Sequence, residues 1–320
     1  MGTDLVPLAT HPIIEGEHTA RSSQRPALVY LASLATGSRR TMRGALDTIA
    51  GLLSSGQADA EGLPWHQLRY EHTAALRAAL VERYAPATCS KLLSALRGVL
   101  RTCRRLELLS GDDYTRAIDL APVRGSRLPK GRALTADELG ALLGACAADN
   151  GPAGARDAAL VAILARGGLR RSEAVALDPA DYDAGAITVR SGKGNKERVC
   201  YIRNGAAAAV ERWIARRGSA AGPLFVGIDK VQRISDRRLT AQAILYILQE
   251  RGEQADLAPF SPHDLRRTMI SDLLDAGADL SAAQQLAGHS NPSTTARYDR
   301  RGEQAKRKAA GLLSFPHSHK

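Results

Sequence analysis

Four short segments of this 320-residue chain hold side chains that together could act on a phosphodiester. The first reads SPHDLRR from Ser261. Serine at the N-cap, proline at the first helical position and Asp264 as the acidic half of a capping box predict that a helix begins here. His263 and Arg266 then share one face near the positive end of the helix dipole, which favours an anion. In the alternative, His263 only caps the helix and Arg266 pairs with Asp264 or Asp272.

The second segment reads RGGLRRSE from Arg166. Two glycines end one helix and permit a tight reversal, which places Arg170 at the start of the next helix. A backbone held from both sides fixes this side chain, and a fixed guanidinium suits bidentate binding of a phosphate. The alternative is an ordinary surface arginine after a glycine turn, which is the role that we expect for Arg171.

The third segment, SGKGNKER from Ser191, is expected to form a hairpin tip. Lys193 lies between two glycines, and Lys196 and Arg198 lie on the return strand. A lysine at such a tip can swing into a groove and donate a proton. A solvated charged turn is the alternative.

The fourth segment reads LAGHSNPSTTARY from Leu286. Gly288 is expected to end a helix, His289 to lie in the turn, and Tyr298 to lie nearly two turns into the helix that Pro292 opens. The Tyr298 hydroxyl is the only plausible nucleophile grouped with these cations. Its ordinary pKa of about 10 keeps it protonated, so attack requires nearby positive charge and a base. The alternative assigns Tyr298 to the edge of the core and His289 to a helix C-cap.

The elements that must position these segments are mostly helical. Apolar spacing predicts an all-helical first domain, with helices near 26–35, 38–54, 66–84 and 87–107. A capping box, Thr135 with Glu138, begins a second domain. There we expect helices near 135–148, 155–166, 205–217 and 239–251, further helices from residues 170, 262, 281, 292 and 302, and strands near 186–191 and 196–202. The second domain is therefore α+β, with a small antiparallel sheet.

One helix of the first domain, at 87–107, is predicted to have a core face and a cationic face. Acids are nearly absent from the cationic face, so phosphate contact is favoured over the alternative of a solvated, ion-paired surface. The predicted DNA contacts are Lys91, Arg97, Arg101, Arg104 and Arg105 on this helix, Arg39, Arg40 and Arg43 on the second helix, and Arg124, Arg127 and Lys130 in a basic linker.

The charge balance agrees with a polyanionic partner. Lys and Arg number 44 against 33 Asp and Glu, which gives a net charge of +11, and most of the cations are arginines. Arginine binds phosphate through two parallel hydrogen bonds, although a GC-rich genome would also raise the arginine content. Aromatic residues make up only 4% of the chain, which favours contact with a duplex backbone over base stacking on single strands. Cysteines without a paired spacing, and the lack of a signal region or a long apolar run, predict a cytoplasmic protein without membrane association.

The order and spacing of the four segments resemble those of the tyrosine recombinases, the phage-integrase and Xer-like family. An arginine comes first, a hairpin lysine follows, then His-x-x-Arg at a capped helix start, then Gly-His with a tyrosine beyond it. The resemblance covers roughly 135–315 strongly and 26–118 by layout only. It implies the tyrosine recombinase fold: mainly α, with a helical core-binding domain at 25–120, a basic linker at 121–133, an α+β catalytic domain at 134–300 and a tail at 301–320 that contacts another protomer. Residues 1–24 lack periodicity and are expected to form a flexible arm, for which the resemblance gives no counterpart in the family.

By this resemblance the catalytic residues are Arg170, Lys193, His263, Arg266, His289 and Tyr298, with Lys193 favoured over Lys196. The family's chemistry breaks and rejoins DNA through a 3′-phosphotyrosine, without metal, ATP or another cofactor. The implied partners are double-stranded DNA with inverted-repeat half-sites, further copies of the chain in a synaptic tetramer, and accessory DNA-bending proteins at the nucleoid. Two alternatives stay open: a type IB topoisomerase, which shares this catalytic set, and a DNA-binding regulator that kept the fold without covalent chemistry.

Overall fold

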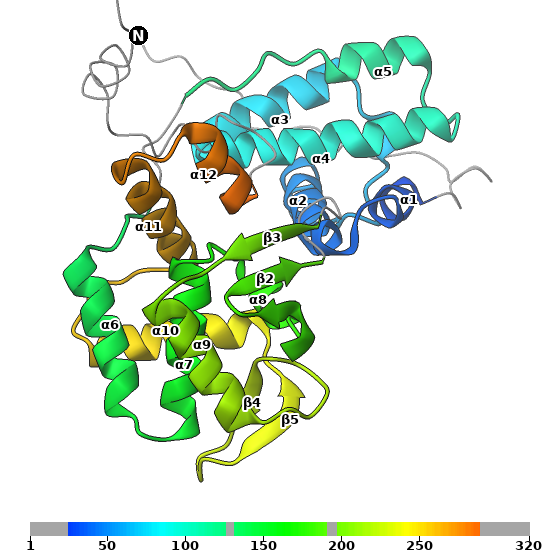
Figure 1. The fold of residues 1–320 in the computed structure, drawn as a ribbon. Coiled ribbons are helices and arrows are strands. Elements are labelled where there is room, and N and C mark those ends of the chain that lie inside the picture. The colour runs from blue at the N-terminus through cyan, green and yellow to red at the C-terminus, as the bar shows by residue number, and fades with distance from the viewer. Residues whose placement is uncertain (1–24, 126–130, 191–196, 289–320) are drawn as a thin grey trace, which may run out of the picture. The chain divides into compact units, whose positions relative to one another are not determined.

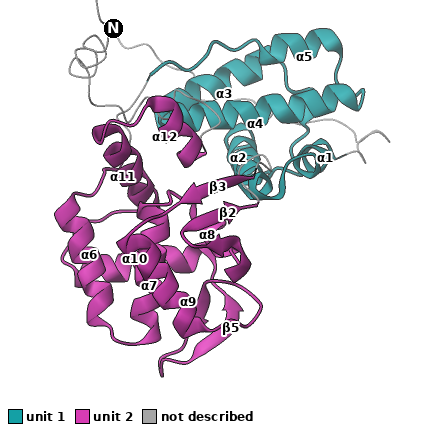
Figure 2. Ribbon diagram, in the orientation of Figure 1, with its two compact units in different colours: residues 1–129 teal, residues 130–320 magenta. Residues whose placement is uncertain are grey.

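The computed structural model describes residues 25–125, 131–190 and 197–288, and the chain divides into two compact units, residues 1–129 and 130–320 (Figures 1 and 2). Each unit has a hydrophobic core of its own. The arm predicted at 1–24 and the tail predicted at 301–320 lie outside the described residues. Within the described ranges, no helix combines the length and the apolar character needed to span a bilayer.

Over its described residues, 25–125, unit 1 is all-helical, as predicted (Figure 1). Its elements are α1 (Pro26–Ala32), α2 (Thr36–Leu53), the 3₁₀ turn η3 (Trp65–Gln67), α3 (Tyr70–Arg83), α4 (Pro86–Arg105) and α5 (Gly111–Ile118). The helix predicted from residue 66 begins only at Tyr70, because Leu68 is extended after the 3₁₀ turn. The helix α5 was not predicted, because its apolar spacing, Tyr114 with Ala117 and Ile118, extends over only two turns.

The two-faced character predicted for α4 is confirmed. Its apolar side is buried and consists of Cys89, Leu92, Leu93, Leu96, Val99, Leu100 and Cys103, together with small residues. Its cations are exposed, apart from the half-buried Arg97. The core of unit 1 therefore forms on one side of this helix only.

Unit 2 contains α6 (Ala136–Ala148), α7 (Pro152–Ala165), α8 (Arg171–Ala176), α9 (Gly205–Arg217), α10 (Ala241–Gln254), α11 (Pro262–Asp275) and α12 (Leu280–Ala287). The central helix is α7, which packs against α6, α9 and α11 and is buried over nearly its whole length. The predicted capping box begins α6: the Thr135 hydroxyl accepts from the Glu138 N–H at 3.2 Å, and the Glu138 carboxylate accepts from the Thr135 N–H at 2.8 Å.

Two small antiparallel sheets complete unit 2. The first has the order β1 (Tyr182–Asp183), β2 (Ala186–Val189) and β3 (Arg198–Tyr201), after a 3₁₀ turn, η4 (Pro179–Asp181), and it pairs Val189 with Arg198. The strands β2 and β3 confirm the predicted antiparallel sheet. The second sheet, β4 (Val226–Ile228) with β5 (Ile234–Arg238), was not predicted, because most of β5 is exposed and its sequence lacks apolar alternation.

Candidate active site

Arg170 is the N-cap of α8, and the two glycines before it reverse the chain after α7. Gly168 has a φ of +62°, and a Cβ built there would lie 2.0 Å from the Met269 Cε. A larger residue would be strained in this left-handed conformation and would have to displace the Met269 side chain, so glycine is favoured where the chain turns toward α8. The tight reversal that the sequence predicted is therefore confirmed.

A buried carboxylate that sequence reasoning missed fixes Arg170. Glu173, which is 3% exposed, accepts from the Arg170 main-chain N–H at 2.9 Å and from its guanidinium at 2.7 Å. It also accepts two hydrogen bonds from Arg198 of β3, at 2.6 and 3.0 Å. Burial alone would raise the pKa of Glu173, but the hydrogen bonds from Arg198 and Arg170 outweigh it and lower the pKa to about 2. The Arg-x-x-Glu spacing at a helix start was the available signal.

Arg266 of α11 is buried, with 1% of its surface exposed. One guanidinium nitrogen donates to the Gly168 carbonyl at 2.5 Å, and the other donates to the Ala287 carbonyl. The Nε–H groups of Arg266 and Arg198 are buried without a hydrogen-bond partner among the described residues. Buried donors of this kind are costly unless a ligand or water binds them.

The two carboxylates considered as partners for Arg266 are engaged elsewhere. Asp264 accepts from the Ser261 N–H and from the Ser261 hydroxyl, both at 2.9 Å, and so supplies the acidic half of the predicted cap. Asp272 pairs with Arg166. The interpretation of Arg266 as an ion-pairing residue is therefore wrong.

The ionisation of the two α11 side chains follows from burial and neighbouring charge. Burial, followed by the charge of Arg170, lowers the pKa of Arg266 to about 10, so this guanidinium stays protonated at neutral pH. His263 keeps a solvent-exposed side. Partial desolvation, followed by the charges of Arg266 and Arg267, lowers the pKa of His263 below 6.5. At pH 7 its imidazole is therefore neutral and can accept a proton.

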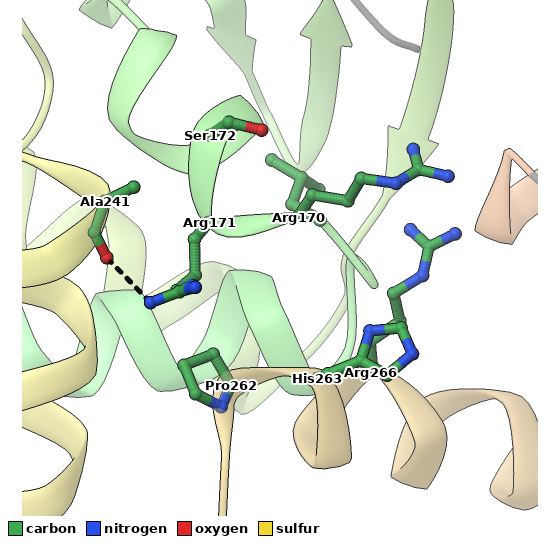
Figure 3. A pocket seen from close by; sticks show the side chains of 8 residues that line it. Arg170, Arg171, Ser172, Ala241, Pro262, His263 and Arg266 are labelled. Atoms are coloured by element: carbon green, nitrogen blue, oxygen red, sulfur yellow. Dashed lines mark hydrogen bonds between the residues drawn. The ribbon is translucent and has the colours of Figure 1, made fainter. Parts of the chain in front are cut away.

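An open pocket of about 320 Å³ brings these groups together (Figure 3). It is lined by Leu169, Arg170, Arg171, Ser172, Ala241, Pro262, His263 and Arg266. Arg171 points to the other side of the pocket and donates to the Ala241 carbonyl at 3.2 Å. Two fixed guanidinium groups beside a neutral imidazole suit a tetrahedral anion whose charge grows during reaction. In ranges 25–125, 131–190 and 197–288, no three His, Cys, Asp or Glu side chains are grouped as metal ligands.

The end of α12 lies against the same arginines. Gly288 ends this helix in the left-handed conformation, with a φ of +62°, as the sequence predicted. Its carbonyl accepts from the Arg170 guanidinium at 3.2 Å, and a Cβ there would lie 2.9 Å from the Arg198 Nε. The other predicted catalytic residues, Lys193 with its alternative Lys196, His289 and Tyr298, lie outside the described residues.

The predicted DNA contacts of unit 1 differ in how they are held. No described carboxylate forms an ion pair with the α4 cations Lys91, Arg97, Arg101, Arg104 and Arg105. On α2, Arg39 donates to the Leu34 and Ala32 carbonyls at 2.9 and 3.1 Å, and Arg43 pairs with Glu61 at 2.7 Å. Arg40 and Arg124 are exposed, and Arg127 and Lys130 lie outside the described residues.

Comparison with known proteins gives consistent matches. The model of the phage integrase family matches residues 132–304. The chain is 33% identical over 224 residues to tyrosine recombinase XerC of Corynebacterium efficiens, covering 69% of each chain. It is 34% identical over 227 residues to tyrosine recombinase XerD of Mycobacterium leprae, covering 68% of this chain and 71% of the relative.

Solved structures share the fold at lower sequence identity. A Tn1549 transposon integrase in complex with transposon right end DNA has a TM-score of 0.66 and 16% identity, covering 91% of this chain and 100% of that chain. A lambda integrase dimer bound to a COC′ core site has a TM-score of 0.63 and 13% identity, covering 88% of this chain and 95% of that chain. These likenesses show that the mainly helical fold with small sheets is that of integrases and recombinases.

Proposed function

The chain belongs to the phage integrase family, and on that premise we propose that it is a site-specific DNA recombinase that cleaves and rejoins duplex DNA through a phosphotyrosine at Tyr298. The observation that carries this proposal is the convergence of Arg170, Arg266 and His263 on one pocket. The Gly288 carbonyl, bound to Arg170, ends α12 beside it. Tyr298 follows Gly288 by ten residues. Ten extended residues span at most about 33 Å, so the chain can bring the tyrosine to the pocket.

The covalent step exchanges one ester for another. The Tyr298 oxygen attacks the scissile phosphorus, the bond from phosphorus to the 5′ oxygen breaks, and the 3′ phosphate stays on the tyrosine. Because the new ester conserves the bond energy, attack by the 5′ hydroxyl rejoins the strand without ATP. Arg170 and Arg266 bind the non-bridging oxygens and stabilise the added negative charge, a role in which one preorganised donor contributes about 3–4 kcal/mol.

Two protons move during cleavage. His263, whose lowered pKa leaves it neutral at pH 7, accepts the Tyr298 proton. Lys193 donates a proton to the leaving 5′ oxygen, and His289 donates a hydrogen bond to a non-bridging oxygen. Rejoining reverses both transfers. Since cationic side chains do here what metal ions do in two-metal nucleases, we expect cleavage to continue in a chelator.

Glu173 is a positioning residue in this scheme. Its buried carboxylate binds the backbone and the guanidinium of Arg170, and it also holds Arg198 beneath the end of α12. An arginine anchored in this way keeps its remaining N–H groups oriented, so little reorganisation is needed when the phosphate gains charge.

Binding of the duplex and assembly follow the same proposal. Unit 1, as the core-binding domain, contacts backbone phosphates through the cationic face of α4, and the basic linker at 121–133 adds further phosphate contacts. Four protomers join two duplexes at inverted-repeat half-sites, aided by DNA-bending proteins at the nucleoid in the cytoplasm. The tail from residue 301, basic first and apolar at Leu312, Leu313 and Phe315, contacts a neighbouring protomer.

The decisive experiment traps the covalent intermediate. Half-sites are taken from inverted repeats in the DNA that flanks the gene, since symmetric protomers require symmetric sites. A suicide substrate, nicked so that the cleaved fragment diffuses away, is incubated in EDTA with the wild type or with Tyr298→Phe. We expect a DNA adduct that survives denaturation with the wild type, and unchanged DNA affinity without an adduct for the variant.

Mass spectrometry of the digested adduct gives the attachment site. An adduct formed by Tyr298→Phe would refute the assignment of the nucleophile. Tight DNA binding by the wild type without any adduct would favour a regulator that kept only the fold, and relaxation of supercoils without a required site would favour a topoisomerase.

A further inference from the structure

The cationic face of α4 is bordered by an aromatic side chain from α5. Tyr114 is 7% exposed, so its ring is fixed in the packing between α5 and α4. Its hydroxyl accepts a hydrogen bond from the Arg101 Nε at 3.4 Å. The Arg104 Cζ lies over the same ring, 5.4 Å from its centroid. One buried tyrosine therefore contacts two exposed arginines that are one helical turn apart.

A second ring lies on the same stretch of α4. Gly98 is in the middle of this helix, and a Cβ built there would lie 2.3 Å from the Tyr30 ring, which comes from α1. Glycine is unfavourable in a helix interior, and the close approach of this ring explains it. The charge of Arg101 opposes the rise that burial causes in the pKa of Tyr30, and the hydrogen bond to Tyr114 raises the pKa of Arg101 itself.

The other contacts of this face are of a different kind. Arg97, half-buried, donates to the Leu120 carbonyl at 3.3 Å. By contrast, Arg101 and Arg104 are exposed, and no described acid pairs with them. Their side chains are therefore held by an aromatic residue that leaves their charge uncompensated.

This arrangement is suited to a phosphate. A guanidinium over an aromatic ring has its plane fixed, while the N–H groups along its edge stay free for two parallel hydrogen bonds. A long side chain that is already ordered loses less freedom when it binds. Pairing with a carboxylate would also order the arginine, but it would neutralise the charge that attracts DNA.

We infer that Tyr114 is a positioning residue for DNA binding, which holds Arg101 and Arg104 in the orientation that contacts two backbone phosphates. This inference rests on the proposed role of the α4 face as a DNA-binding surface. Tyr114 itself acts through the arginines: its hydroxyl accepts the hydrogen bond from Arg101, and its ring lies beneath the guanidinium of Arg104.

Because the hydroxyl and the ring contact different arginines, double-mutant cycles can test the two contacts separately. The probe is a fluorescently labelled duplex of arbitrary sequence, titrated with the full-length protein at several salt concentrations, because backbone contact does not depend on sequence. Tyr114→Phe keeps the ring and removes the hydroxyl, and Tyr114→Leu removes both. We expect Kd to rise about twofold for Tyr114→Phe and about fivefold for Tyr114→Leu, as for exposed cation–π and hydrogen-bonded arginines.

The cycles distinguish positioning from general loss of structure. The effect of Tyr114→Phe should disappear in an Arg101→Ala background and persist in an Arg104→Ala background, whereas Tyr114→Leu should have no effect once both arginines are alanine. Tyr70→Leu, on the exposed side of α3, is the matched control and should bind like the wild type. Circular dichroism confirms that each variant is folded.

Two failures are distinguishable. Each arginine variant should lower the slope of log Kd against log salt by about 0.9, and unchanged slopes would overturn the proposed DNA-binding face itself. If the arginines matter but Tyr114→Leu weakens binding equally with and without them, the positioning role is refuted while the DNA-binding face stands.

Discussion

Replacement of Glu173 by Gln tests the buried centre of the candidate active site. The variant keeps the shape of the side chain but removes its charge. Four hydrogen bonds then lose their ionised acceptor, two from Arg170 and two from Arg198. The variant leaves the charge of Arg198 without a compensating partner. This is costly because the Arg198 side chain is only 13% exposed.

The size of the effect follows from the pKa of the carboxyl. The gap between its ordinary value of 4.5 and its value of about 2 in the folded protein corresponds to about 3 kcal/mol. Since folding lowers this pKa, the contribution is complete above 4.5 and is lost as the pH falls toward 2. The free energy of unfolding of Glu173→Gln should therefore be about 3 kcal/mol below that of the wild type at pH 7, and the difference should shrink below pH 4.5.

Tryptophan fluorescence during denaturation by guanidinium measures the free energy of unfolding of unit 2, which contains Glu173. The chain has two tryptophans, Trp65 in unit 1 and Trp213 in unit 2, and both are buried. A Trp65→Phe background leaves Trp213 to report unit 2 alone, and Asp183→Asn, at an exposed carboxyl, is the control, expected within about 0.5 kcal/mol of its parent. A loss below about 1 kcal/mol at pH 7, or one that stays constant down to pH 3, would refute the reasoning.

Three further predictions concern the reaction on the suicide substrate. Because His263 has a lowered pKa, the rate of adduct formation should rise with pH with a midpoint below 6.5, and His263→Gln should remove that rise. A wild-type midpoint above 6.5 would contradict its role as base. Arg170→Ala should slow cleavage about 10²–10³-fold with little change in DNA affinity, because other cations hold the duplex. Equal losses in gel-shift and cleavage assays would count against a transition-state role. Deletion of residues 303–320 should abolish recombination and the higher-order complexes seen in gel filtration, while one protomer should still bind DNA. Recombination at the wild-type rate would disprove the tail contact.

Much of the catalytic unit was predictable because its signals are local. Thr135 with Glu138 marked the start of α6, and the glycines before Arg170 and at residue 288 marked the ends of α7 and α12. Each signal depends on backbone geometry over three or four residues, which the local sequence dictates. The same holds for the two faces of α4, since helical period alone separates its leucines from its arginines.

Other features depend on contacts between distant segments. The eight-residue α5 shows apolar spacing over only two turns and the exposed hairpin β4–β5 shows none, so both depend on what they pack against. Glu173 has a local signal in the Arg-x-x-Glu spacing, but its contact with Arg198 arises only when β3 brings that arginine to the same carboxylate. Tyr114 of α5 likewise contacts Arg101 and Arg104 only because α5 packs against α4.

By itself the sequence determined the family and the predominance of helices, and it predicted the residue types of a catalytic set, because these depend on order, spacing and short-range periodicity. It left two roles open for Arg266, as an ion-pairing residue or as part of an anion site. Only the tertiary structure excluded the ion pair, because it directs Asp264 and Asp272 to other partners and places Arg266 between the Gly168 and Ala287 carbonyls. The role in an anion site stays a prediction. The physical reason is that the partner of a buried charge is selected by which distant segments pack around it, and packing is a property of the whole fold.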